Sequence, residues 1–270
     1  MINKYLNSRY LGALIILPFI TFLFLGGIYL KYFVLILSLA GMYELYKVIK
    51  FKSINPFSYV GYFLCLAFYL TLGKNIDYKF IFFAIIFSLL IMFCIPILDN
   101  KYNFIDISVT LLAFLYIAVF FSFIVLVDNK QYGNYYVWLI FISSWMCDTS
   151  AYYSGKFFGK TKLCPKISPK KTVEGSIGGL LGSTFSCGLF GAFIISQGAP
   201  VSLMHFIIIG IICGVFSQLG DLAASSIKRF VGVKDYGHLI PGHGGILDRF
   251  DSILFSGLVV FYYLTFVLNI

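Results

Sequence analysis

The sequence predicts an all-α integral membrane protein that crosses the bilayer many times, with about nine transmembrane helices. Hydrophobic residues make up 60% of the 270 residues and charged residues only 11%, whereas a soluble domain carries about 25% charged residues. A soluble chain of this length does not bury so much apolar surface. The 31 Phe and 20 Tyr residues also exclude disorder, because disordered chains are poor in aromatic residues.

The apolar residues lie in runs that suit helices rather than strands. A transmembrane helix needs about 20 apolar residues, and the runs lack the polar–apolar alternation of transmembrane β-strands. The nine predicted spans lie near residues 10–28, 31–48, 57–73, 80–98, 105–127, 135–154, 176–197, 202–222 and 252–269.

The basic residues predict how these spans are oriented. The loops on one side of the bilayer carry 16 Lys and Arg residues, and those on the other side carry four. Basic loops stay in the cytoplasm, so we expect a cytoplasmic N-terminus and an external C-terminus. The two long loops, 155–175 and 223–251, then face the cytoplasm. Because no long soluble extension accompanies the spans, we expect a bacterial cell (inner) membrane.

The chain divides into two parts that differ in composition. Residues 1–130 are apolar helices with short loops, and their acids, such as Glu44 and Asp106, lie near predicted span ends, where we expect solvated charges. We interpret this part as a scaffold. Residues 131–270 are richer in glycine, and their acids and bases lie at and between the predicted helices, so we expect the chemistry there. Small residues recur every fourth position within 176–197, which permits close packing against a neighbouring helix.

Two aspartates lie at or near the predicted membrane depth. Asp148 is close to the end of its span, and Asp221 follows a run of apolar and small residues. An ionisable residue at this depth is costly, and it is a functional candidate by default. If the helix continues past Asp221, then Ser225 and Lys228 share its face. This arrangement suits a metal-bound phosphate, and a charge that merely emerges at the membrane interface is the alternative.

A glycine-rich stretch before the last span carries a second group of acids. Glycines flank His243, so the backbone there can approach a ligand closely. Asp248 and Asp251 are three residues apart at the predicted start of a helix, where the dipole tolerates carboxylates. With Asp221 they offer oxygen ligands for Mg²⁺ rather than a zinc site. Arg249 can bind a phosphate through two parallel hydrogen bonds.

The other long loop, 155–175, is strongly basic. It contains six lysines and a single acid, Glu174, and two of the lysines, Lys170 and Lys171, follow Pro169. We favour phosphate binding here, and contact with anionic lipid is the alternative. The two loops together predict a soluble polyphosphate and an anionic lipid as substrates.

The loop expected at 223–251 contains a recognisable motif. Residues 225–251 are S-S-I-K-R-F-V-G-V-K-D-Y-G-H-L-I-P-G-H-G-G-I-L-D-R-F-D, which resembles the signature of the phosphatidate cytidylyltransferases (CDP-diacylglycerol synthases). The upstream D-T-S-A-Y and S-P-K-K-T-V-E-G are similar to that family too. The positions that match the signature are Ser225, Lys228, Arg229, Lys234, Asp235, Gly237, Pro241, His243, Gly244, Gly245, Asp248, Arg249 and Asp251.

This resemblance implies a helical membrane enzyme, often dimeric, that makes CDP-diacylglycerol from CTP and phosphatidic acid. It implies Mg²⁺ held by Asp221 and Asp248, beside a second, monovalent cation, with Asp251 and Asp148 as supports. His243 is expected to be either a phosphate donor or a structural residue of the glycine turn. We expect partners in the lipid bilayer and in a second copy of the chain, and none among nucleic acids. The residues expected to hold phosphates are Lys170, Lys171, Lys228, Arg229 and Arg249.

Other functions fit parts of the pattern less well. A secondary transporter would explain acids within the membrane, but the charges here gather in two loops on one side. A CTP-dependent lipid kinase and a CDP-alcohol phosphotransferase are alternative enzymes, although Ser252 replaces the glycine that follows D-x-x-D in the latter. A lipid-binding scaffold without catalysis would leave the acid cluster unexplained.

Overall fold

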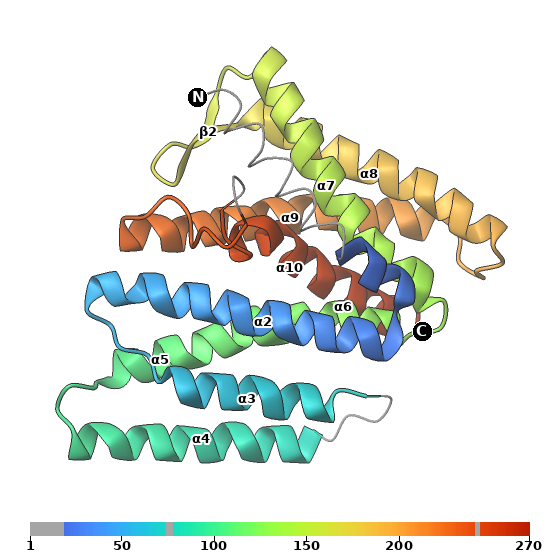
Figure 1. The fold of residues 1–270 in the computed structure, drawn as a ribbon. Coiled ribbons are helices and arrows are strands. Elements are labelled where there is room, and N and C mark those ends of the chain that lie inside the picture. The colour runs from blue at the N-terminus through green and yellow to red at the C-terminus, as the bar shows by residue number, and fades with distance from the viewer. Residues whose placement is uncertain (1–18, 74–77, 241–243) are drawn as a thin grey trace. The chain divides into compact units, whose positions relative to one another are not determined.

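A computed structural model describes residues 19–73, 78–240 and 244–270, and it is predominantly helical (Figure 1). The predicted all-α fold is confirmed, since the described sheet has only two short strands. The elements are α2 (Gly27–Ile49), η1 (Lys50–Lys52), α3 (Ser58–Thr71), α4 (Tyr78–Leu98), α5 (Phe104–Ala113), η2 (Phe114–Val119), α6 (Phe120–Asp128), α7 (Gly133–Phe158), β1 (Lys162–Cys164), β2 (Ser168–Thr172), α8 (Val173–Ser196), α9 (Leu203–Val231), α10 (Leu247–Tyr262) and η3 (Tyr263–Val267).

Six helical segments within the described ranges are long and apolar enough to cross a membrane. They do not include α3, which has only 14 residues, or α7. The expected count of nine is therefore not confirmed, and residues 10–18 of the first expected span, 10–28, lie outside the described residues. The six segments are Gly27–Lys52, Lys79–Leu98, Phe104–Asp128, Val173–Ser196, Leu203–Val231 and Leu247–Val267.

The chain forms two compact units. The first comprises Met1–Asn129 and Asp235–Asp248, and the second comprises Lys130–Lys234 and Arg249–Ile270. In the first unit, α2 and α4 both pack against α3, which lies between them in Figure 1.

Two acids of the first unit correct the expectation of solvated charges at span ends. Glu44 is 1% exposed and Asp106 is fully buried. Each finds backbone N–H donors inside the protein, as at Asp106, where Asn55 and Asn103 donate over 2.6 and 2.8 Å. Burial of these carboxylates is tolerated because charged hydrogen bonds replace water.

In the second unit, small residues let α7, α8 and α9 pack closely, as the four-residue repeat predicted. A Cβ atom on Gly179 would lie 3.0 Å from the carbonyl oxygen of Cys147, so α8 approaches the backbone of α7. On the same face of α8, the Ser183 hydroxyl donates to the Gly210 carbonyl of α9 over 2.8 Å. The opposite face of α8 is exposed and apolar, with Leu181 63% and Phe185 69% exposed.

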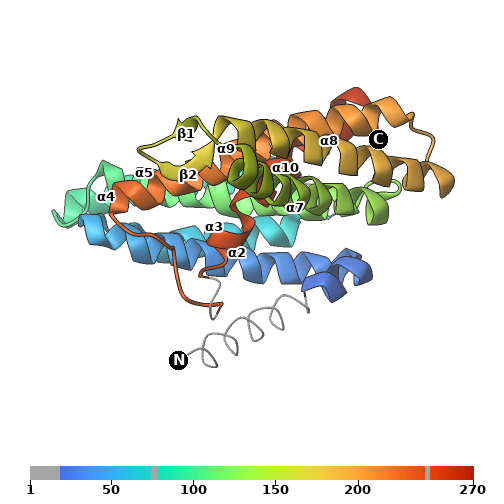
Figure 2. The same cartoon turned by 90° about the horizontal axis from the view of Figure 1, so that it is seen from above.

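The loop between α7 and α8 is a β-hairpin. Strands β1 and β2 are antiparallel, with Lys162 opposite Thr172 and Cys164 opposite Ser168, and the hairpin lies at one end of the α7–α8 pair (Figure 2). The Thr172 hydroxyl then accepts the Gly175 N–H over 3.1 Å and caps α8. This cap fixes the point at which β2 ends and α8 begins.

Two predicted loop boundaries are wrong. The loop expected at 223–251 begins only at Gly232, because α9 continues to Val231 and ends where Gly232 adopts φ +86°. A glycine in this left-handed conformation ends a helix readily. Helix α7 likewise continues to Phe158, so Asp148 lies well inside a helix rather than at its end.

Candidate functional site

The second unit contains a cavity of about 350 Å³, bordered by α7, α8, α9 and the hairpin. Its charged and polar lining includes Asp148, Lys156, Lys170, Lys171, Gln218 and Asp221. Four of these residues were singled out in the sequence: two aspartates and the Lys170–Lys171 pair. The folded unit brings these predicted bases and acids to one cavity, although they lie on three different elements.

Lys171 and Asp221 form the central ion pair of this cavity. The Lys171 ammonium lies 2.5 Å from an Asp221 carboxylate oxygen, and the two side chains are 26% and 28% exposed. The Ser225 hydroxyl donates to the other Asp221 oxygen over 3.2 Å. Since Ser225 lies one turn after Asp221 on α9, the expectation of a shared helix face is confirmed.

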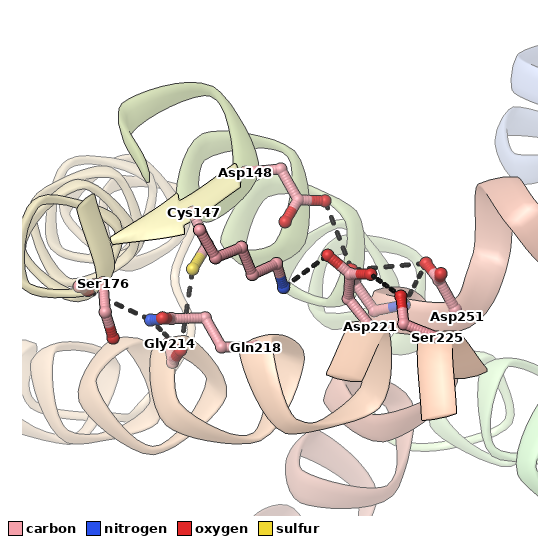
Figure 3. Close-up of polar contacts among 10 residues, drawn as sticks. Cys147, Asp148, Ser176, Gly214, Gln218, Asp221, Ser225 and Asp251 are labelled. Atoms are coloured by element: carbon pink, nitrogen blue, oxygen red, sulfur yellow. Dashed lines mark hydrogen bonds and ion pairs between the residues drawn. The ribbon is translucent and has the colours of Figure 1, made fainter. Parts of the chain in front are cut away.

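Two further aspartates lie next to this pair (Figure 3). Asp148 accepts a hydrogen bond from the Ser252 hydroxyl over 3.2 Å, and Asp251 accepts the Ser252 N–H over 2.8 Å. Asp221 interacts electrostatically with both of them. Lys228 is 8% exposed and interacts with Asp251, which is also 8% exposed. Three helices thus each contribute one carboxylate to a single cluster.

A glycine allows α9 and α10 to meet at this cluster. A Cβ atom on Gly220 would lie 2.5 Å from the Asp251 carbonyl oxygen and 2.8 Å from the Phe255 ring. Farther along α10, the Ser144 hydroxyl of α7 donates to the Ser256 hydroxyl over 2.8 Å. The Gly220 contact thus places α9 directly against α10, and the Ser144–Ser256 bond joins α7 to α10.

The donor atoms of the cluster fit Mg²⁺ chemically. Carboxylates and hydroxyls are the hard oxygen ligands that this ion prefers. Within the described ranges, no three His, Cys, Asp or Glu side chains are arranged to hold a metal by themselves. An ion here would complete its shell with water and substrate phosphates, which is how Mg²⁺ usually binds.

The remaining predicted residues lie in different places. Arg229 is exposed, and its guanidinium donates to the carbonyls of Ile167 and Val233 over 3.1 and 3.2 Å. Arg249 is exposed and interacts electrostatically with Asp148.

Asp248 belongs to the first unit, where one of its oxygens accepts the N–H groups of Tyr236 and Gly245 over 2.8 and 3.0 Å. His243 lies outside the described residues, so its expected role stays a prediction.

Three polar residues of the cavity and cluster have no role among those predicted from the sequence. Gln218 lines the cavity and donates to the carbonyls of Ser176 and Gly214 over 3.1 and 2.9 Å. An amide three residues before Asp221 in an apolar helix was the available signal. Lys156 lines the cavity from α7, and Ser252 contacts Asp148. No sequence spacing relates Ser252 to a residue 104 positions earlier.

Comparison with known proteins gives the family of the chain. A sequence model described as "Cytidylyltransferase family" matches residues 7–267. The chain belongs to the cytidylyltransferase family. The resemblance inferred from the motif over residues 225–251 is therefore confirmed at the level of the family.

Several relatives carry the name phosphatidate cytidylyltransferase. A Staphylococcus saprophyticus protein is 42% identical over 158 residues, which cover 58% of each chain. A Bacillus subtilis protein is 40% identical over 172 residues, or 63% of each chain, and a Staphylococcus aureus protein is 41% identical over 158 residues, or 58% of each chain. The alignments thus span less than two thirds of these relatives' own length.

Proposed function

We propose that the protein transfers the cytidylyl group of CTP to phosphatidic acid and releases CDP-diacylglycerol and pyrophosphate. The observation that carries this proposal is the cavity of the second unit, whose lining includes Lys170, Lys171, Asp148 and Asp221. Bases for phosphates and acids for a divalent cation are the groups that nucleotidyl transfer requires. The names of the relatives supply the identity of the two substrates.

The surface of the second unit supports a lipid substrate. Ile177, Leu181, Phe185 and Leu189 recur every four residues along α8, and each is 55 to 69% exposed. An exposed apolar stripe of this kind is unfavourable in water and favourable in a bilayer. The opposite face of the same helix borders the cavity through Gly175 and Ser176. A lipid in the bilayer could therefore present its head group close to the cavity.

The chemistry proposed here needs positive charge more than it needs a base. The nucleophile is a phosphomonoester with a second pKa of about 6, so it is largely dianionic at neutral pH. One of its oxygens bonds to the α-phosphorus of CTP. The bond from that phosphorus to the oxygen bridging to the β-phosphate breaks, and pyrophosphate leaves with the electron pair. Because two anions must meet, catalysis comes from positioning and charge neutralisation.

The basic residues of the cavity meet this requirement. Lys170 and Lys171 line the cavity directly, and we assign them to phosphate groups. Lys228 is held in the carboxylate cluster, and we assign it to phosphate binding beside Asp251. Arg229 and Arg249 are exposed guanidinium groups that can each bind a phosphate through two hydrogen bonds.

We assign Mg²⁺ to Asp221 and Asp248, with Asp251 and Asp148 as supports. When bound, the ion would neutralise charge on the CTP phosphates and on the leaving pyrophosphate. Each partner of the Lys171–Asp221 pair would then have a role, since the carboxylate would bind the cation and the ammonium would bind a phosphate. A second, monovalent cation remains part of the proposal.

The setting of the enzyme follows from the same proposal. The six apolar helical segments fit a multi-pass membrane protein. We propose the bacterial inner membrane with the active site facing the cytoplasm, because CTP is a cytoplasmic nucleotide and the basic loops favour that side. A homodimer is proposed from the resemblance, and no nucleic-acid partner is proposed.

A direct assay tests the function. Purified protein in phosphatidic acid vesicles is incubated with radiolabelled CTP, with and without Mg²⁺, and the lipid is extracted. We expect label in the organic phase only when CTP, phosphatidic acid and Mg²⁺ are all present. The label is placed in the cytidine of CTP, so a lipid kinase, which transfers only the γ-phosphate, would leave the extracted lipid unlabelled. Unlabelled lipid would therefore count against cytidylyl transfer, and CTP-independent uptake of a solute into the vesicles would instead support a transporter.

A further inference from the structure

Glu44 accepts hydrogen bonds from the backbone at the beginning of α10. It lies within residues 1–130, which we interpreted from the sequence as a scaffold. Its side chain, on α2, is 1% exposed. One carboxylate oxygen accepts the N–H of Ile246 and the other accepts the N–H of Leu247, each over 2.9 Å. These bonds link positions 202 and 203 residues apart. The first N–H groups of a helix have no partner within the helix, and Glu44 supplies one for two of them.

The loop before α10 is shaped to fit this carboxylate. A Cβ atom on Gly245 would lie 2.6 Å from both Glu44 oxygens, and one on Gly237 would lie 2.8 Å from one oxygen. Any side chain at either position would therefore displace Glu44 or the loop. Both glycines match the motif that resembles the family signature, and Glu44 lies outside that motif.

The same stretch of backbone holds Asp248. One Asp248 oxygen accepts the N–H of Gly245 over 3.0 Å and that of Tyr236 over 2.8 Å. Three consecutive N–H groups, those of Gly245, Ile246 and Leu247, thus bind either Asp248 or Glu44. The position of the Asp248 carboxylate depends on where Glu44 holds this backbone.

We propose that Glu44 is a positioning residue for Asp248, and this inference rests on the proposed role of Asp248 as a Mg²⁺ ligand. Glu44 acts through the backbone of residues 245–247 and touches no substrate. Loss of a group that orients a metal ligand typically lowers metal affinity about 10- to 100-fold. A purely structural cap would lower the stability of the fold without changing the apparent affinity for Mg²⁺.

Asp106 provides a matched control in the same unit. It is buried like Glu44, and each of its oxygens also accepts one backbone N–H, from Asn55 and Asn103. Its contacts lie in the α3–α5 region and not in the loop before α10. Asp106→Asn therefore removes an equivalent pair of charged hydrogen bonds away from Asp248.

The experiment compares Glu44→Gln, Glu44→Asp and Asp106→Asn with the unchanged full-length protein in lipid vesicles. Hydrogen–deuterium exchange is followed at the amides of residues 245–247, and thermal unfolding is followed during a Mg²⁺ titration. For Glu44→Gln we expect faster exchange at these amides and a Mg²⁺ midpoint about tenfold higher. Glu44→Asp should shift both readouts less and in the same direction. Asp106→Asn should lower the melting temperature without moving the Mg²⁺ midpoint.

Two results would overturn the inference. One is hydrogen–deuterium exchange at residues 245–247 that is as slow in the Glu44 variants as in the original protein. The other is a Mg²⁺ midpoint that stays within about twofold of the original protein in both Glu44 variants. An equal midpoint shift in Asp106→Asn would also overturn it, because the effect would then be general destabilisation. Neither readout requires turnover. A wild-type protein without CTP-dependent activity would count against the proposed function, while the exchange and the titration would still decide the role of Glu44.

Discussion

Gly220→Ala tests whether the contact between α9 and α10 sets the active geometry. The added Cβ would lie 2.5 Å from the Asp251 carbonyl oxygen, and ordinary contact begins at 3.4 Å. The two helices must therefore separate locally by about 0.9 Å to reach van der Waals distance. Asp221 follows Gly220 directly, and Asp251 is the residue displaced. The substitution thus moves two of the three clustered carboxylates relative to each other without removing either.

The expected effect falls on turnover more than on stability. A misplacement of about 1 Å in an active site can lower the rate about 100-fold. Overpacking costs about 1–3 kcal/mol, and replacing glycine by alanine in a helix recovers about 1 kcal/mol. The net loss of about 0–2 kcal/mol leaves the variant folded. We expect kcat for CTP-dependent lipid labelling to fall about 100-fold, with a modest change in melting temperature.

Gly188→Ala is the matched control, since it is also a glycine inside a helix of the second unit. A Cβ there would lie 3.5 Å from Ile207 Cγ1, which is ordinary contact. We expect unchanged turnover and a slightly higher melting temperature. If Gly220→Ala retained turnover within about twofold of the unchanged protein, the argument that this helix contact positions the carboxylates would be refuted.

Three further predictions address individual side chains. Lys171→Ala should raise the apparent KM for CTP or lower kcat, whereas Lys166→Ala, in the same hairpin but outside the cavity lining, should do neither. Equal effects of the two substitutions would instead support the alternative that the loop contacts anionic lipid. Asp221→Asn should abolish Mg²⁺-dependent turnover in folded protein, and Asp99→Asn, at the end of α4, should leave it intact; activity in Asp221→Asn would contradict the metal assignment. Ser252→Ala removes the hydroxyl bond to Asp148 and should lower kcat about three- to tenfold, converted from about 1 kcal/mol for a hydrogen bond, and an unchanged kcat would show that Asp148 is held by other contacts.

The fold class and most helix positions were predictable because they depend on local composition. An apolar run of sufficient length forms a helix in a bilayer whatever surrounds it. The face shared by Asp221 and Ser225 was predictable for the same reason, since helical geometry relates residues four apart. The ends of the helices were predicted less accurately than their positions. The continuation of α9 to Val231 was not predicted, because the polar last turns of this helix have the composition of a loop.

The sequence suggested that carboxylates would lie close together, but it did not show which side chains contact one another. Asp148 and Ser252 are 104 residues apart, and only the packing of their helices brings them to 3.2 Å. Glu44 shows the limit most clearly. A carboxylate near a predicted helix end is solvated in most proteins, and nothing local marks this one as buried.

What the sequence determined by itself was therefore local: apolar helices, small-residue faces, and a motif whose residue types suit phosphate and cation chemistry. The tertiary structure decided which charges meet, because contacts between residues 50 to 200 positions apart depend on how whole helices pack. It also decided that a scaffold residue, Glu44, supports the backbone beside Asp248. Backbone N–H groups at a helix start must find partners, and the partner need not be near in sequence.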